Sequence, residues 1–170
     1  MTNLNPEPLT RKNFAPFGGV VEIDGAHHYP INQGFAERFN DLANVDIAAE
    51  GGKVNVSIVT ATPRPQPIAL KVMERHSLGS QIFYPLQDRP WLVVVCENPH
   101  DEKTFRAFSA SGHQGINYAR NIWHHPLLVF DAGSRFLVVD RQGPGINLEE
   151  IWLNEILEIS AIGSGRFSQS

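Results

Sequence analysis

Cysteine is nearly absent from this sequence, since Cys96 is the only one among 170 residues. A disulfide within the chain and a metal cluster of several cysteines are therefore both excluded. Long apolar runs are also missing, because the longest, Trp91 to Cys96, is far too short to cross a bilayer. The polar segment from Met1 to Lys12 lacks the apolar core of a signal peptide. We therefore expect a cytoplasmic protein that does not enter membranes.

Several sequence motifs that mark common enzyme classes are absent as well. No run of Lys or Arg is present that would contact successive phosphates, and the formal net charge is -4, so nucleic acid is not an expected partner. The sequence has no glycine-rich phosphate loop, no G-x-S-x-G elbow and no Cys-x-x-Cys. These absences argue against nucleotide-dependent chemistry and against a serine-hydrolase mechanism.

The composition is that of an ordinary folded protein, with 42% hydrophobic and 19% charged residues. A chain of this length predicts one domain, which we place at residues 1–162. Residues 163–170 are small and polar apart from Phe167, and predict a flexible C-terminal tail.

Short β-rich runs separated by turn residues dominate the sequence and predict a mainly β fold, an antiparallel sandwich or barrel. The predicted strands are Val54 to Ala61, Ile68 to Glu74, Gln81 to Leu86, Trp91 to Cys96, Thr104 to Ala110, Leu127 to Asp131 and Arg135 to Asp140. In the first, Val54, Val56 and Ile58 alternate with other residues, which predicts one packed face and one face toward water or a cavity. Thr10 is expected to cap a short helix, and residues 147–159 to form a helical turn followed by a strand.

Polar residues with a defined spacing follow the second predicted strand, in the segment Glu74-Arg75-His76-Ser77-Leu78-Gly79-Ser80-Gln81. On a strand, Glu74 and His76 point to the same face, and Gln81 can return to that face across the intervening turn. The pattern resembles the first cupin motif, with Glu74 at the position of its first histidine and Gln81 at that of its glutamate. The alternative is a surface strand end in which Glu74 pairs with Arg75 or Lys71.

A second polar segment, residues 114–126, ends in Trp123-His124-His125-Pro126. Neighbouring side chains on a strand face opposite ways, so only one of His124 and His125 is expected to point inward. Imidazole and carboxylate groups are common ligands of divalent metals, and we take Glu74, His76 and His125 as the expected ligand set. The alternative is one core imidazole beside one surface imidazole.

Four stretches together make the chain resemble the ureidoglycolate lyase family, also called the ureidoglycolate hydrolase family. They are residues 31–42 (INQGFAERFNDL), residues 74–81, the segment Gln114 to Tyr118 with Arg120-Asn121 and residues 123–126, and Phe136-Leu137 with Asp140-Arg141. The resemblance implies a cupin-like antiparallel β-barrel with a few short helices, forming a homodimer. It also implies a lyase of purine and allantoin catabolism that splits ureidoglycolate into glyoxylate and urea, and a divalent metal such as nickel.

The reaction requires a base, an acid and an anchor for the substrate carboxylate. Among the matched residues, the catalytic candidates are His76, Glu74, His125 and His124, because imidazole titrates near neutral pH. The candidates for substrate binding are Arg75, Gln81, Asn117, Tyr118 and Arg120. Two other classes of function stay open: another cupin-type metalloenzyme, and a non-catalytic barrel that binds a small molecule.

Overall fold

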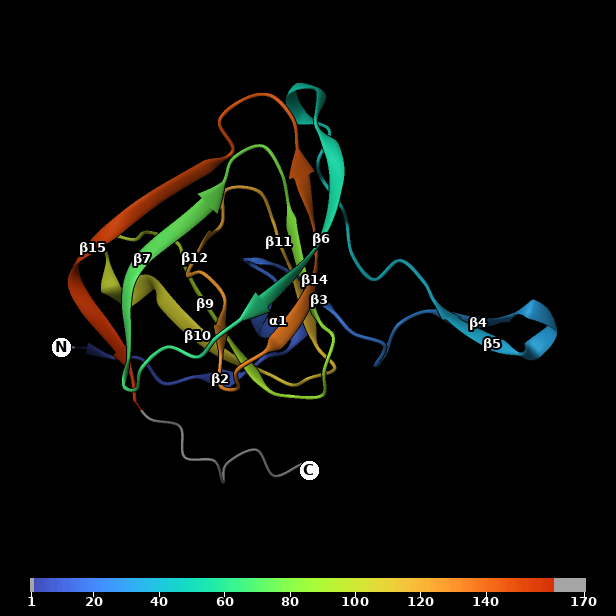
Figure 1. Cartoon of the computed structure of the whole chain (residues 1–170), viewed down its shortest axis with the longest axis horizontal. Helices are drawn as coiled ribbons and strands as arrows, with labels where there is room; N and C mark the ends of the chain where they lie inside the picture. Colours follow the sequence, from blue (N-terminus) through green and yellow to red (C-terminus); the bar gives the residue numbers. More distant parts are fainter. Residues whose placement is uncertain (1, 161–170) are drawn as a thin grey trace.

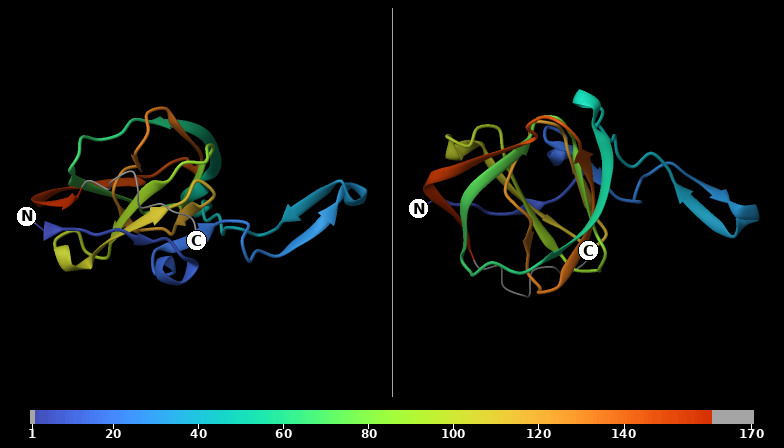
Figure 2. Two further views of the ribbon diagram at one scale, coloured as in Figure 1. Left: turned by 90° about the horizontal axis from the view of Figure 1, so that it is seen from below. Right: turned by 45° about the horizontal axis from the view of Figure 1, so that its top comes forward.

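The strands of the chain form two facing sheets and one separate hairpin in the computed structural model, which describes residues 2–160. Figure 1 shows the two sheets opposite each other and the β4–β5 hairpin standing away from them, and both views of Figure 2 show the same projection. The prediction of a mainly β protein with few helices is confirmed. The predicted tail at 163–170 lies outside the described residues.

The larger sheet has eight strands in the order β1-β15-β7-β12-β9-β10-β2, with β13 paired to β9. Its strands are β1 (Thr2–Asn3), β2 (Glu7–Pro8), β7 (Ile68–His76), β9 (Trp91–Cys96), β10 (Phe105–Ala110), β12 (Trp123–His124), β13 (Leu128–Val129) and β15 (Leu148–Ile159). Most neighbours are antiparallel, but the short pairs β1–β15 and β2–β10 at the edges are parallel. The predicted bounds of β9 are confirmed, whereas β13 is shorter than predicted.

The smaller sheet has five strands in the order β3-β11-β8-β14-β6, so that β6 is an edge strand. Its strands are β3 (Gly18–Val21), β6 (Lys53–Ala61), β8 (Gln81–Pro85), β11 (Gly115–Tyr118) and β14 (Ser134–Gln142). The separate hairpin pairs β4 (His28–Ile31) with β5 (Ala36–Phe39). The 3-10 turns are η1 (Asn32–Gly34), η2 (Ala49–Gly51) and η3 (Glu102–Thr104).

The main hydrophobic core lies between the two sheets. Trp91, Val93 and Val95 of β9 meet Ile116 of β11 and Phe136 of β14 there. The other face of β9 packs into a second cluster that includes strands β7 and β15. All six residues of β9 are buried, which explains why its sequence is continuously apolar rather than alternating.

The short α-helix α1 (Arg11–Phe14) packs on the core through Phe14, which is fully buried. Thr10 caps it as predicted: its hydroxyl accepts a hydrogen bond from the Asn13 N–H, and the Asn13 side chain accepts one from the Thr10 N–H. In the part of the chain that the structure describes, no helix is long and apolar enough to cross a membrane.

Two local predictions were wrong. Residues 148–159 contain no helical turn, because β15 pairs with β7 along this stretch, with an irregularity between Trp152 and Leu157. The backbone hydrogen bonds of the sheet therefore override the helical spacing of Leu148 and Ile151. In β6, the face with Val54, Val56 and Ile58 is exposed, and the polar Asn55 lies on the half-buried face. Alternation identified the two faces correctly but not which of them is covered.

Candidate functional site

A carboxylate and two imidazoles converge on the inner side of the larger sheet. Glu74 and His76 alternate on β7, and the pairing of β12 with β7 places His124 directly opposite Glu74. One ligand atom from each of the three residues lies within 4.8 Å of the others. His124 Nε2 is 3.4 Å from Glu74 Oε1, and the rings of His76 and His124 are 5.4 Å apart. We call these three residues the Glu-His-His cluster.

Hydrogen bonds to backbone carbonyls determine which ring nitrogen of each of the two imidazoles carries the hydrogen. Nδ1 of His124 lies 2.9 Å from the carbonyl oxygen of Ile122, and Nδ1 of His76 lies 3.3 Å from that of Asn147. A carbonyl only accepts, so each Nδ1 carries the hydrogen and donates it. Both Nε2 atoms are buried and have no hydrogen-bond partner. Their lone pairs therefore face a carboxylate, an arrangement that a cation between them would stabilise.

This arrangement fits a divalent metal ion. Three ligand atoms of types that first-row metals prefer lie close together, and each histidine donates its other ring N–H to a carbonyl, as metal-bound histidines commonly do. Glu74 and His76 are half-buried, whereas His124 is buried. The sequence predicts His125 as the third ligand, but the structure places His124 there.

The cluster shifts the acidity of its own members. Burial raises the pKa of Glu74, but the neighbouring histidines, His124 foremost, outweigh it and leave the pKa below its usual value. Burial lowers the pKa of His76. At neutral pH the site therefore holds an ionised carboxylate beside a neutral His76, the protonation states that metal ligands need.

The facing sheet contributes a second set of side chains around the cluster. Tyr118 of β11 stacks on His124, with ring centroids 4.0 Å apart and planes inclined by 14°. Burial, and secondarily the charge of Glu74, raises the pKa of Tyr118, which keeps its hydroxyl protonated. Gln81 of β8 is buried and donates to Asp140 Oδ2 at 3.3 Å, while its Oε1 has no partner. Two predicted substrate-binding residues, Tyr118 and Gln81, thus lie beside the cluster.

Sequence reasoning missed Asp140 and Asn55, which belong to the same network. Asn55 of β6 donates to Asp140 Oδ1 at 2.9 Å, and the negative charge of Asp140 acts on His76. Both residues are polar positions within otherwise apolar strands, since Asp140 follows Phe136 to Val139 and Asn55 stands between two valines. Their position on the inner side was the available signal, because a polar residue facing inward needs a partner or a ligand.

The structure does not bring the predicted arginines to the cluster. Arg75 lies between Glu74 and His76 on β7, so it faces the other way, where it pairs with Glu149 at 2.7 Å and covers the Trp123 ring. Arg120 donates to the carbonyl of Ser77 and lies 3.6 Å from Asp46.

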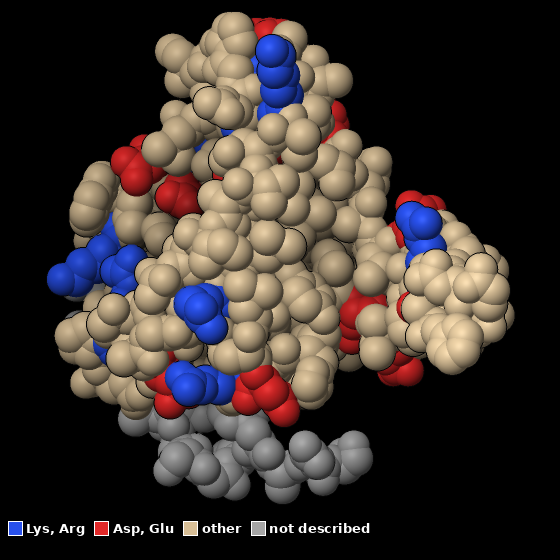
Figure 3. All heavy atoms as spheres, turned by 45° about the vertical axis from the view of Figure 1, so that its right-hand side comes forward, with Lys and Arg blue, Asp and Glu red and all other residues tan. Residues whose placement is uncertain are grey.

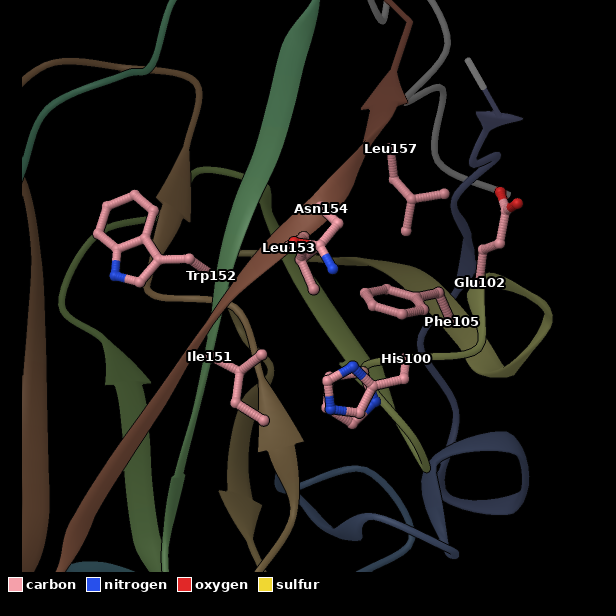
Figure 4. Close-up of a pocket in the computed structure, with 9 residues that line it drawn as sticks. His100, Glu102, Phe105, Ile151, Trp152, Leu153, Asn154 and Leu157 are labelled. Carbon is pink, nitrogen blue, oxygen red and sulfur yellow. The ribbon is translucent and has the colours of Figure 1, made fainter.

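Two surface hollows lie apart from the cluster. One, of about 460 Å³, is lined by the predicted residues Asn117 and Arg120 together with residues of the 41–46 segment. The other, of about 180 Å³, lies between the β15 strand and the loop around His100, and Figure 4 shows Phe105 and Leu157 at its wall. Neither is lined by Glu74, His76 or His124.

His125 is also buried, and its burial predicts a pH dependence of stability. Burial lowers the pKa of His125 from 6.5 to about 4, so the folded chain favours the neutral ring. Its contribution to stability is then complete above about pH 6.5 and is lost as the pH falls toward 4, at most roughly 3 kcal/mol. We expect the free energy of unfolding, measured in urea, to fall across this window. The variant His125→Gln should flatten this dependence, whereas His113→Gln, at an exposed position, should leave it unchanged.

Comparison with known proteins gives one consistent family. The family model described as ureidoglycolate lyase matches residues 1–160. Ureidoglycolate lyase 1 of Rhizobium meliloti (strain 1021) is 54% identical over 157 residues, covering 92% of each chain. Ureidoglycolate lyase of Burkholderia cepacia is 51% identical over 150 residues, covering 87% of this chain and 85% of its own.

Among solved structures, a 3,4-ketoisomerase from Helicobacter canadensis is similar over 74% of this chain and 84% of its own, with 13% identity and a TM-score of 0.45. Oxalate decarboxylase from Bacillus subtilis is similar over 64% of this chain and 29% of its own, with 14% identity and a TM-score of 0.36.

Proposed function

Because this chain belongs to the ureidoglycolate lyase family, we propose that it splits ureidoglycolate into glyoxylate and urea at the Glu-His-His cluster. The observation that carries the placement is the pair of buried, unpartnered Nε2 atoms beside an ionised carboxylate. The family supplies the reaction, and the cluster supplies the groups that it requires. The corresponding pathway is the breakdown of allantoin in purine catabolism.

The chemistry of the substrate defines what the site must do. The central carbon of ureidoglycolate bears a carboxylate, a hydroxyl and a ureido nitrogen. Removing the hydroxyl proton and protonating that nitrogen breaks the C–N bond, leaving an aldehyde and an intact urea. The protein therefore has to move one proton from oxygen to nitrogen.

Glu74, His76 and His124 would hold a divalent ion, for which the family expectation is nickel. Such an ion supplies a positive charge that lowers the pKa of the substrate hydroxyl. With an ion held there, Glu74 would be the group left to take the hydroxyl proton and return it to the ureido nitrogen. Without an ion, Nε2 of His76 is free to carry out the same transfer.

The facing sheet is suited to bind the ureido group. Oε1 of Gln81 is a buried acceptor without a partner, and we assign it to the ureido N–H groups. The protonated hydroxyl of Tyr118 is assigned as a donor to the substrate. Asn117 and Arg120 stay predictions as substrate contacts, in the hollow outside the cluster.

Stoichiometry tests the assignment. Turnover of racemic ureidoglycolate should release urea and glyoxylate in equal amounts, because C–N cleavage leaves the urea fragment whole. Colorimetric determination of glyoxylate, urea and ammonia in one time course measures this. Ammonia as the primary nitrogen product would reject the lyase reaction.

We further propose that residues 1–162 fold as one cupin-like domain, in which the two facing sheets form the walls of a barrel, and that the protein acts in the cytoplasm. The main core between the sheets supports the barrel, because residues of both sheets pack in one cluster.

A homodimer completes the proposal. A second copy of the chain would cover the unpaired edge of strand β6 and its exposed apolar outer face. Light scattering at micromolar concentration should give about twice the mass of the 18.9 kDa chain. A single-chain mass would contradict the dimer.

A further inference from the structure

A long stretch of this chain forms strands without burying a residue. Between Val21 and Ile68, all of residues 22–67 are described, and every one is exposed or half-buried. The stretch contains the β4–β5 hairpin and the nine-residue strand β6. A two-stranded hairpin alone is marginally stable in water, so the β4–β5 hairpin would gain from contact with a further surface.

The hairpin and its flanking residues, 24–41, form what we call the arm. Within the arm, His28 pairs with Glu37 at 2.6 Å and packs on Phe39, and Tyr29 reaches Asn40. Phe35 at its tip is 92% exposed. Figures 1 and 2 show the arm pointing away from both sheets. The tip therefore presents a large apolar ring that is available for contact with another molecule.

The outer side of β6 is the second uncovered surface. Val54, Val56 and Ile58 are 55%, 61% and 55% exposed. On the neighbouring strand β14, Val139 lies opposite Val56 and Leu137 opposite Ile58, so the apolar area continues across two strands. We call these five residues the β6 face. Figure 3 shows a broad area without charged side chains on the side of the molecule that carries β6 and the arm.

Charge makes the two surfaces complementary. The arm contains Asp24, Glu37 and Asp41 but only Arg38 of opposite sign, a formal net charge of -2. The β6 face is bordered by exposed cations, Lys53 where the strand begins and Arg135 opposite Thr60 near its end. An acidic arm with an apolar tip therefore fits an apolar face between two basic ends.

We propose that the arm of each copy of this chain docks on the β6 face of a second copy. Each copy has one arm and one β6 face, so in a two-fold symmetric dimer both arms are bound and both faces are covered. The inference rests on the proposed homodimer and adds to it the segment exchanged and the surface that receives it.

Engineered cysteines test the exchange in the full-length protein. Cys96 is buried, and burial raises its pKa to about 12, so it leaves the background unreactive. Phe35→Cys and Ile58→Cys are made separately, one copy carries a mass tag, and the two are mixed and treated with a bismaleimide. We expect a mixed cross-linked dimer, and none when His113→Cys replaces Ile58→Cys. A dimeric protein that gives no mixed product overturns the arm inference alone, whereas a monomer overturns the homodimer as well.

A charge placed on the face gives an independent readout. Val56→Lys should raise the dissociation constant of the dimer by roughly tenfold or more, because a desolvated, unpaired ammonium is costly at an interface. Leu148→Lys is the matched control, since Leu148 is a similarly exposed aliphatic residue, 51%, on the other sheet. Equal dissociation constants for the Val56→Lys variant and the unmodified protein would place the interface elsewhere.

Discussion

Replacement of His76 by alanine is expected to lower kcat by roughly a hundredfold to ten-thousandfold, because the variant loses a ligand of the proposed ion or, without an ion, the group that transfers the proton. The side chain lies in the Glu-His-His cluster with an unpartnered Nε2, and it is half-buried rather than packed in the core. The folded state should therefore persist, with an unchanged circular dichroism spectrum. Steady-state release of glyoxylate measures the loss.

The control variants follow from the positions of the other histidines. His113→Ala removes an imidazole that is largely exposed and should retain full activity. His124→Ala should lose activity as His76→Ala does, whereas His125→Ala should lower kcat much less, because His125 is not a member of the cluster. A folded His76→Ala variant with full activity would exclude the catalytic role.

Removal of divalent metal is expected to lower activity by roughly a hundredfold to a thousandfold, since an ion that polarises the substrate hydroxyl contributes several kcal/mol. Protein purified without chelator should contain about one ion per chain by elemental analysis. Glu74→Gln should weaken retention of the ion, because an amide is a poorer ligand than a carboxylate. Lys71→Gln on the same strand is exposed and serves as the control.

Readdition of metal distinguishes loss of the ion from loss of the fold. Activity should return when nickel, the metal expected from the family, is added to the metal-free protein. The same assay with other divalent ions gives the order in which the site prefers them. Full activity in metal-free protein would show that the reaction does not need the ion, and Nε2 of His76 would then be the group that transfers the proton.

Sequence reasoning succeeded where a local rule is sufficient. Alternation placed Glu74 and His76 on one face, because every strand obeys that period. The same rule required the side chains of His124 and His125 to point to opposite sides of the strand. It did not determine which of the two faces Glu74. That choice depends on the register between β12 and β7, which pairs His124 with Glu74 across nearly fifty residues of sequence. Register is set by the whole sheet and is not written in either segment.

The failures have a related cause. Alternation in β6 predicts one packed face without saying which, and within one copy the covered side is the one with Asn55, which reaches Asp140, rather than the apolar side with Val56. Hydrophobic patterning shows that a face avoids water and does not say whether the same chain or another molecule covers it. Asp140 was overlooked for the reverse reason, since one polar residue at the end of an apolar run looks like a strand end.

The three members of the Glu-His-His cluster all come from strands of the larger sheet, whereas Tyr118, Gln81, Asp140 and Asn55 all come from the smaller one. In the proposed mechanism, holding the ion and recognising the substrate thus belong to separate structural units. Substitutions in β8 or β11 can change which molecule is accepted while the adjacent pairing of β7 with β12 keeps the ligand geometry. A site divided in this way can evolve toward new substrates without first losing its catalytic centre.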